Sequence, residues 1–175
     1  MDRRKIIIRQ VVKYGIFVLS VFILYILQST PGFMKIFGLK PVFIVPFCIT
    51  LSMLDDSWQR FIVYVIGGLL TDLSSTRVVG TFSIQLLIAC IVGIIAVKFF
   101  FKPNKRNCYL FSFTAMTSML SMEFLVSYVM RGFDSMFLFY LVSVVLLSAY
   151  SALFSIPFYH FIDLINMRFI RFDAR

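Results

Sequence analysis

Residues 80–97 read GTFSIQLLIACIVGIIAV and contain no charged side chain. A helix needs about 20 apolar residues, each rising about 1.5 Å, to cross the hydrocarbon core of a bilayer. A helix that is apolar on every side is typical of a buried or membrane-embedded segment. This stretch is therefore predicted to be a membrane-spanning helix.

The composition of the whole chain supports the same class of protein. The 175 residues are 61% hydrophobic and 14% charged, whereas soluble domains are about 45–50% apolar and about 25% charged. A single soluble domain of this length has too much surface to hide so many apolar side chains. We expect one transmembrane domain over residues 1–175, an all-α polytopic bundle of about six transmembrane helices.

Five further apolar runs are predicted to complete the bundle. The six predicted spans are residues 14–27, 42–54, 61–70, 80–97, 108–130 and 136–161. The second and third runs are short for a bilayer, so they are either two full spans extended into the interface or a re-entrant pair. Without them a four-span bundle remains, but its long external loop would be unusual. Pro157 is predicted to kink the last span.

The basic residues predict the orientation. The net charge is +9. With six spans, the predicted cytoplasmic segments hold 13 of the Lys and Arg residues and the external segments hold four, which places both termini in the cytoplasm. The basic segment 1–13 and the tail 166–175 would lie at the inner leaflet. We interpret the charge as membrane anchoring and expect no nucleic acid partner.

Polar residues within apolar runs are costly and need a reason. Glu123 lies in the middle of the predicted fifth span, either as a ligand for an ion or substrate or as a hydrogen-bonding link between helices. Asp72 shares a helical face with Tyr64 and Gly68. Its carboxylate could cap the next helix, pair with Arg77 or meet a partner.

Small residues form stripes that let helices pack closely in lipid. Gly67 and Gly68 are adjacent, and two further stripes consist of Gln85, Ala89, Gly93 and Ala96, and of Ser148, Ser151, Ala152 and Ser155. These stripes are candidates for packing or for binding a partner helix. Cys48, Cys90 and Cys108 form no CxxC pair and are interpreted as packing residues. No catalytic or metal-binding motif is recognised, so we expect neither an enzyme nor a cofactor.

The order of these features resembles the MreD family of rod shape-determining membrane proteins. The resemblance rests on the basic start, Leu27-Gln28-Ser29-Thr30, Pro41, the run GGLLTDLSS at residues 67–75, Val79-Gly80-Thr81 and Gln85. Family members often carry an acidic residue soon after the proline, where this chain has Val42 and Phe43.

The resemblance implies a non-catalytic scaffold of the cell-wall elongation machinery in the bacterial plasma membrane. Its implied partners are an MreC-like bitopic protein, the MreB filament and the glycosyltransferase–transpeptidase pair. The implied fold is similar to that of the substrate-binding subunits of energy-coupling-factor transporters. A vitamin-type transport subunit with a pocket lined by Glu123 and Gln85 is the alternative. A lipid-precursor enzyme is less favoured, because Asp55-Asp56 is the only acidic pair and is typical of a solvated cap.

Overall fold

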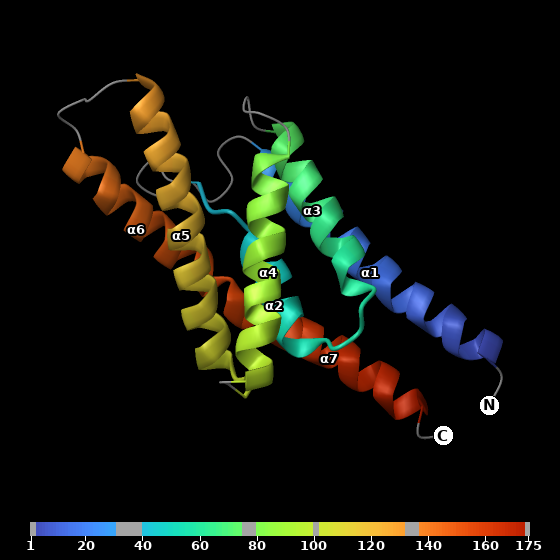
Figure 1. The fold of residues 1–175 in the computed structure, drawn as a ribbon. Coiled ribbons are helices and arrows are strands. Elements are labelled where there is room, and N and C mark those ends of the chain that lie inside the picture. The colour runs from blue at the N-terminus through green and yellow to red at the C-terminus, as the bar shows by residue number, and fades with distance from the viewer. Residues whose placement is uncertain (1–2, 31–39, 75–79, 100–101, 132–136, 174–175) are drawn as a thin grey trace.

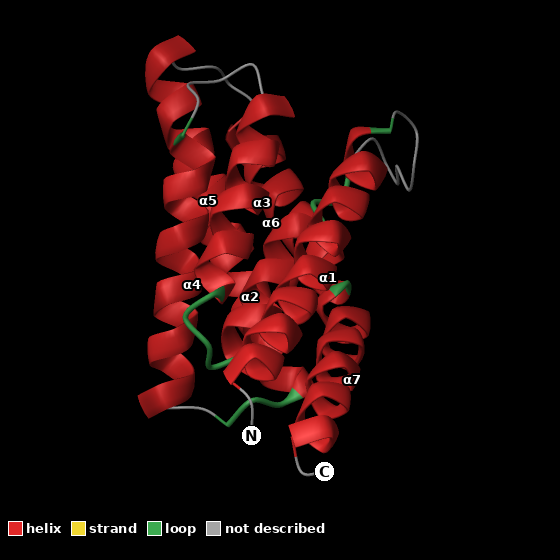
Figure 2. Cartoon of the chain, turned by 90° about the vertical axis from the view of Figure 1, so that its right-hand side faces the viewer, coloured by secondary structure: helices red, strands yellow, loops and turns green. Residues whose placement is uncertain are grey.

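The computed structural model describes residues 3–30, 40–74, 80–99, 102–131 and 137–173, and within these residues every regular element is an α-helix (Figures 1 and 2). The helices are α1 (Arg3–Ser29), α2 (Ile44–Leu54), α3 (Arg60–Ser74), α4 (Thr81–Phe99), α5 (Lys105–Arg131), α6 (Phe137–Leu153) and α7 (Ser155–Asp173). The prediction of an all-helical bundle is confirmed. The basic residues predicted to precede the first span belong to α1, and residues 166–173 continue α7.

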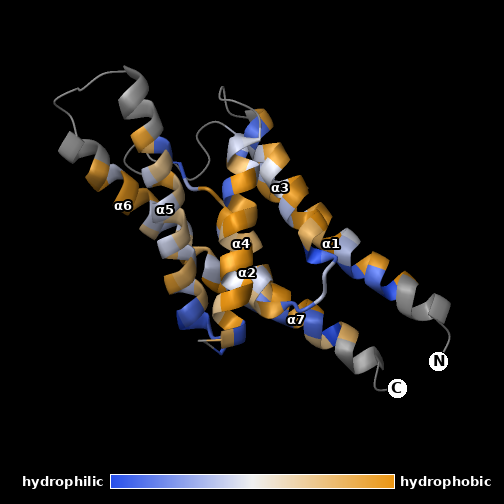
Figure 3. Ribbon diagram, viewed as in Figure 1, coloured by the Kyte–Doolittle hydropathy of each residue, from blue (hydrophilic) through white to orange (hydrophobic). Residues whose placement is uncertain are grey.

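Three stretches of helix are long and apolar enough to cross a bilayer. They are Ile8–Ser29, Thr81–Phe99 and Leu141–Phe169. Their surfaces are apolar as well: Leu19 is 60% exposed and Ile84 is also 60% exposed. Figure 3 shows apolar residues along α1, α3 and α4 and polar residues gathered near the start of α5. Such exposed apolar faces are stable in lipid, which accepts apolar side chains on every side of a helix.

Helix α2 forms the centre of the bundle. All ten of its residues from Ile44 to Met53 are buried, and α2 packs against α1, α3, α4, α5 and α7. At about 1.5 Å per residue, its 11 residues extend only about 16 Å, roughly half the hydrocarbon thickness. The predicted second span therefore contains a short helix enclosed by protein.

Residues 40–43 lead into α2, and side chains of other helices satisfy two of their backbone donors. The N–H of Val42 donates to the Ser151 hydroxyl at 3.0 Å, and the N–H of Phe43 donates to Gln28 Oε1 at 3.2 Å. Non-helical backbone at membrane depth is tolerated only when protein groups satisfy it. Ser151 and Gln28 thus hold this lead-in to α2 in place.

The predicted last span, residues 136–161, is two helices, with a break at Phe154, one turn before Pro157, where the sequence predicted a kink. A proline inside a helix lacks the N–H that would bond the carbonyl four residues earlier, and its ring clashes with that carbonyl. For Pro157 that carbonyl belongs to Leu153, the last residue of α6. Placing Pro157 in the first turn of α7 avoids the clash, so the chain breaks one turn before the proline.

Aromatic side chains and buried cysteines fill the core. Phe17 meets Phe47 edge to face with ring centroids 6.4 Å apart, and Phe47 meets Phe158 in the same way at 5.5 Å. These contacts join α1, α2 and α7. Cys48, Cys90 and Cys108 are buried free thiols, which confirms their interpretation as packing residues.

Candidate functional site

Asp72 caps the first turn of α4 from the end of α3. Its Oδ1 accepts the N–H of Phe82 at 3.0 Å, and its Oδ2 accepts the N–H and the hydroxyl of Ser83 at 3.0 and 2.5 Å. Burial raises the pKa of Asp72, but the hydrogen bonds outweigh it and hold that pKa below its usual value. Capping was one of the predicted roles of Asp72; the alternative partner, Arg77, lies outside the described residues.

Two glycines allow this close approach of α3 and α4. A Cβ on Gly68 would lie 2.7 Å from the Cα of Ser83, so only a residue without a side chain fits there. Gly80 has a φ of +105°, which glycine adopts without strain, at the start of α4. Both belong to the element on which the family resemblance rests, and both shape the α3–α4 connection.

Two other predicted small residues pack inside the bundle. A Cβ on Gly67 would lie 3.0 Å from Ile44 Cγ2 of α2, and a Cβ on Gly93 would lie 2.7 Å from the Ser52 hydroxyl. Both glycines therefore bring their helices close to α2. They do not face the outside of the bundle.

The serine stripe of α6 and α7 is also internal. Ser148, Ser151, Ala152 and Ser155 are all fully buried. The Ser148 hydroxyl lies 2.9 Å from that of Thr117 on α5, and Ser151 holds the backbone of Val42. The structure thus places this stripe in packing contacts within the chain.

An open groove lies between α4 and α5. It encloses about 300 Å³, and its lining includes Gln85 and Ala89 of the predicted α4 stripe with Ala115 and Ser118 of α5. Gln85 Oε1 is buried and has no hydrogen-bond partner among the described residues. A surface of small side chains is suited to the close approach of another helix.

Glu123 lies on α5, one turn beyond Met119, and is partly exposed. It is not among the side chains that line the groove. Glu123 therefore does not belong to the groove that Gln85 lines. No group of three His, Cys, Asp or Glu side chains that could hold a metal ion occurs in the described parts of the chain.

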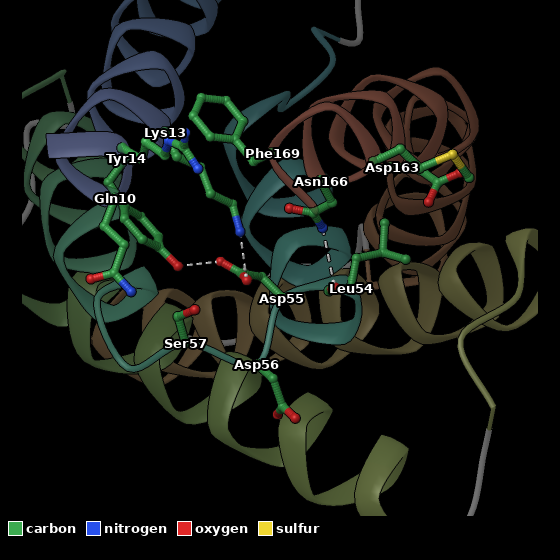
Figure 4. A pocket seen from close by; sticks show the side chains of 12 residues that line it. Gln10, Lys13, Tyr14, Leu54, Asp55, Asp56, Ser57, Asp163, Asn166 and Phe169 are labelled. Carbon is green, nitrogen blue, oxygen red and sulfur yellow. Dashed lines mark hydrogen bonds and ion pairs between the residues drawn. The ribbon is translucent and has the colours of Figure 1, made fainter. Parts of the chain in front are cut away.

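A polar cavity that the sequence did not reveal lies where α1, the α2–α3 turn and α7 meet (Figure 4). The Lys13 ammonium lies 2.9 Å from Asp55 Oδ1, and the Tyr14 hydroxyl donates a short hydrogen bond to Asp55 Oδ2. Asn166 of α7 donates to the carbonyl of Leu54 at 3.2 Å. The cavity encloses about 440 Å³.

Asp55 corrects one expectation drawn from the sequence. The Asp55-Asp56 pair was expected to be a solvated cap, yet Asp55 is only 6% exposed, while Asp56 is exposed as expected. Burial of a carboxylate is tolerable here because Lys13 and Tyr14 supply an opposite charge and a hydrogen bond. The signal for this site in the sequence was the pair Lys13 and Tyr14, a lysine next to a tyrosine near the start of an apolar helix.

Comparison with family models, with curated proteins and with solved structures finds no match to this chain.

Proposed function

We propose that this chain is a non-catalytic membrane scaffold of the MreD type, whose α4–α5 groove binds the transmembrane helix of an MreC-like bitopic protein. The groove is the observation that supports this proposal. Gln85, Ala89, Ala115 and Ser118 provide small or polar side chains over two helices. Helices associate in lipid through such close-packing surfaces and through interhelical hydrogen bonds.

The surroundings of the groove are consistent with a lipid-facing docking surface. Ile88 and Val92 of α4 and Met122 of α5 line the groove and are 56%, 49% and 57% exposed. The partner helix would cover these side chains and pack against Ala89 and Ala115.

In this proposal the chain crosses the membrane six times, with both termini in the cytoplasm. Helix α2 alone covers roughly 16 Å of the bilayer thickness of about 30 Å, and it would cross together with residues 40–43, which lead into it. Arg9 of α1 and Phe169 of α7 line the same cavity, so the start of α1 and the end of α7 lie at one end of the bundle. An even number of crossings places them on one side of the membrane.

The remaining partners follow from the same proposal. The cytoplasmic end would lie near the MreB filament, and the bound bitopic protein would connect the scaffold with the glycosyltransferase–transpeptidase pair. The alternative, a vitamin-type transport subunit, required Gln85 and Glu123 in one pocket. Because Glu123 does not line the groove, we propose the scaffold.

A pair of matched substitutions on α4 tests the groove. Ala89→Phe fills the groove, whereas Ile91→Phe places the same side chain at a residue of α4 that is 43% exposed and does not line it. In cells depleted of the native protein, Ala89→Phe is expected to abolish co-purification of the bitopic partner and to give rounded cells. Ile91→Phe is expected to preserve both. Equal recovery of the partner with both variants, at equal abundance, would contradict the proposal.

A further inference from the structure

The polar cavity between α1, the α2–α3 turn and α7 differs in charge from the rest of the chain. The chain has 17 basic and eight acidic residues, yet three of the acidic residues, Asp55, Asp56 and Asp163, line this cavity. Arg9 and Lys13 line it as well. The cavity therefore presents both signs of charge. A purely basic surface would instead attract anionic lipid.

The charged side chains of the cavity come from three parts of the chain. Arg9 and Lys13 belong to α1, Asp55 and Asp56 follow α2, and Asp163 belongs to α7; Figure 4 shows Asn166 of α7 between Lys13 and Asp163. Asp55 is already bound to Lys13 and Tyr14. Asp163 makes no ion pair with any residue that the structure describes. A ligand with a cation at one end and an anion at the other matches this arrangement.

We propose that the cavity binds the headgroup of a phosphatidylethanolamine molecule. Asp163 would accept hydrogen bonds from the ammonium group, and Arg9 with Lys13 would bind the phosphate. The volume of about 440 Å³ lies within the range of small-molecule sites, about 300–1,000 Å³. Met167 lines the cavity and is 51% exposed, so it would contact the acyl chains.

This inference rests on the proposed function in one respect: the membrane orientation places the cavity at the headgroups of the inner leaflet. The charges then discriminate among lipids. Phosphatidylglycerol has no ammonium group to offset repulsion between its phosphate and the acidic side chains of the cavity. Phosphatidylcholine has a cation, but its methylated nitrogen donates no N–H hydrogen bond to a carboxylate. Phosphatidylethanolamine alone among the three supplies both a phosphate and a donating ammonium group.

The test uses purified full-length protein in detergent, with each of the three lipids added in turn. Native mass spectrometry measures the lipid bound, and thermal unfolding measures stabilisation. Phosphatidylethanolamine is expected to bind about tenfold more tightly than phosphatidylcholine, as one or two charge-assisted hydrogen bonds would give. Equal binding of these two lipids, or tighter binding of phosphatidylglycerol, would overturn the proposal.

Three variants test whether the lipid binds in this cavity. Asp163→Asn and Arg9→Gln are each expected to reduce the preference for phosphatidylethanolamine about tenfold. Lys105→Gln, at an exposed residue at the start of α5, is the control and should retain it. An unchanged preference in both cavity variants would overturn the proposal. If a cavity variant fails to fold, the comparison of lipids on the native protein decides. No partner protein is present, so the outcome is independent of groove docking.

Discussion

The carboxylate of Asp72 at the end of α3 binds both the backbone N–H and the hydroxyl of Ser83 in the first turn of α4, at 3.0 and 2.5 Å. One side chain thus satisfies donors at a helix start that would otherwise have no partner. The same contact fixes the angle at which α4 leaves α3. Because α4 supplies one wall of the groove, Asp72 acts on the proposed partner site through the position of this helix.

Asp72→Asn is expected to destabilise the protein by about 1–2 kcal/mol, because the amide cannot accept three hydrogen bonds as a carboxylate does. Thermal unfolding in detergent measures the change. Asp56→Asn, at an exposed aspartate, is the control and should change stability by less than about 0.5 kcal/mol. Equal stability of Asp72→Asn and the native protein would show that the cap has no structural role.

The cap also predicts a dependence on pH. The pKa of Asp72 is lower in the folded protein than its usual value, so the charged form stabilises the fold above the usual pKa. This stabilisation is lost as the pH falls through the lowered pKa. The stability difference between the native protein and Asp72→Asn should be constant near neutral pH and shrink below about pH 5. A difference that grows on acidification would contradict the assignment.

Gly68→Ala is expected to separate α3 from α4 and to cost about 1–3 kcal/mol, because the new methyl group would lie 2.7 Å from the Ser83 Cα. Gly15→Ala is the matched control: a Cβ there meets nothing within 4 Å, and alanine favours helix by about 0.5–1 kcal/mol. The two variants should therefore shift the unfolding temperature in opposite directions. A loss of stability in Gly15→Ala alone would refute the packing argument.

Lys13→Met is expected to destabilise the protein by about 3 kcal/mol, because it leaves Asp55 charged and buried without its cation. The double variant Lys13→Met with Asp55→Asn removes that charge and should recover part of the loss. A double-mutant cycle on unfolding free energies measures this coupling. Additive effects of the two substitutions would mean that the 2.9 Å contact between Lys13 and Asp55 contributes nothing.

The sequence predicted what depends on local patterns. Apolar runs predicted helices in the right places, and the polar stretch after Gly67-Gly68 pointed to a cap by Asp72, whose partners lie ten and 11 residues away. The contact between Asp55 and Lys13 joins residues 42 positions apart, so no local sequence pattern predicts it. Pro157 also indicated the break at Phe154, because its ring would clash with the carbonyl of Leu153, four residues earlier.

The sequence also did not predict which helix surfaces pack against one another. A stripe of small residues looks the same whether it meets its own chain or a partner. Gly93 and Ser151 are buried inside the bundle, whereas Ala89 lines the open groove. Only the three-dimensional arrangement separates residues that pack the bundle from residues that remain accessible to another helix.

The most direct test of the scaffold proposal is site-specific photocrosslinking in native membranes. A photoreactive residue at Ser118 lies in the α4–α5 groove, and one at Ile91 lies on α4 outside the groove. The expected result is a crosslink from Ser118 to the transmembrane helix of a bitopic protein, with none from Ile91. Crosslinks from Ile91 but not from Ser118, or crosslinks from Ser118 to lipid alone, would contradict helix docking in the groove.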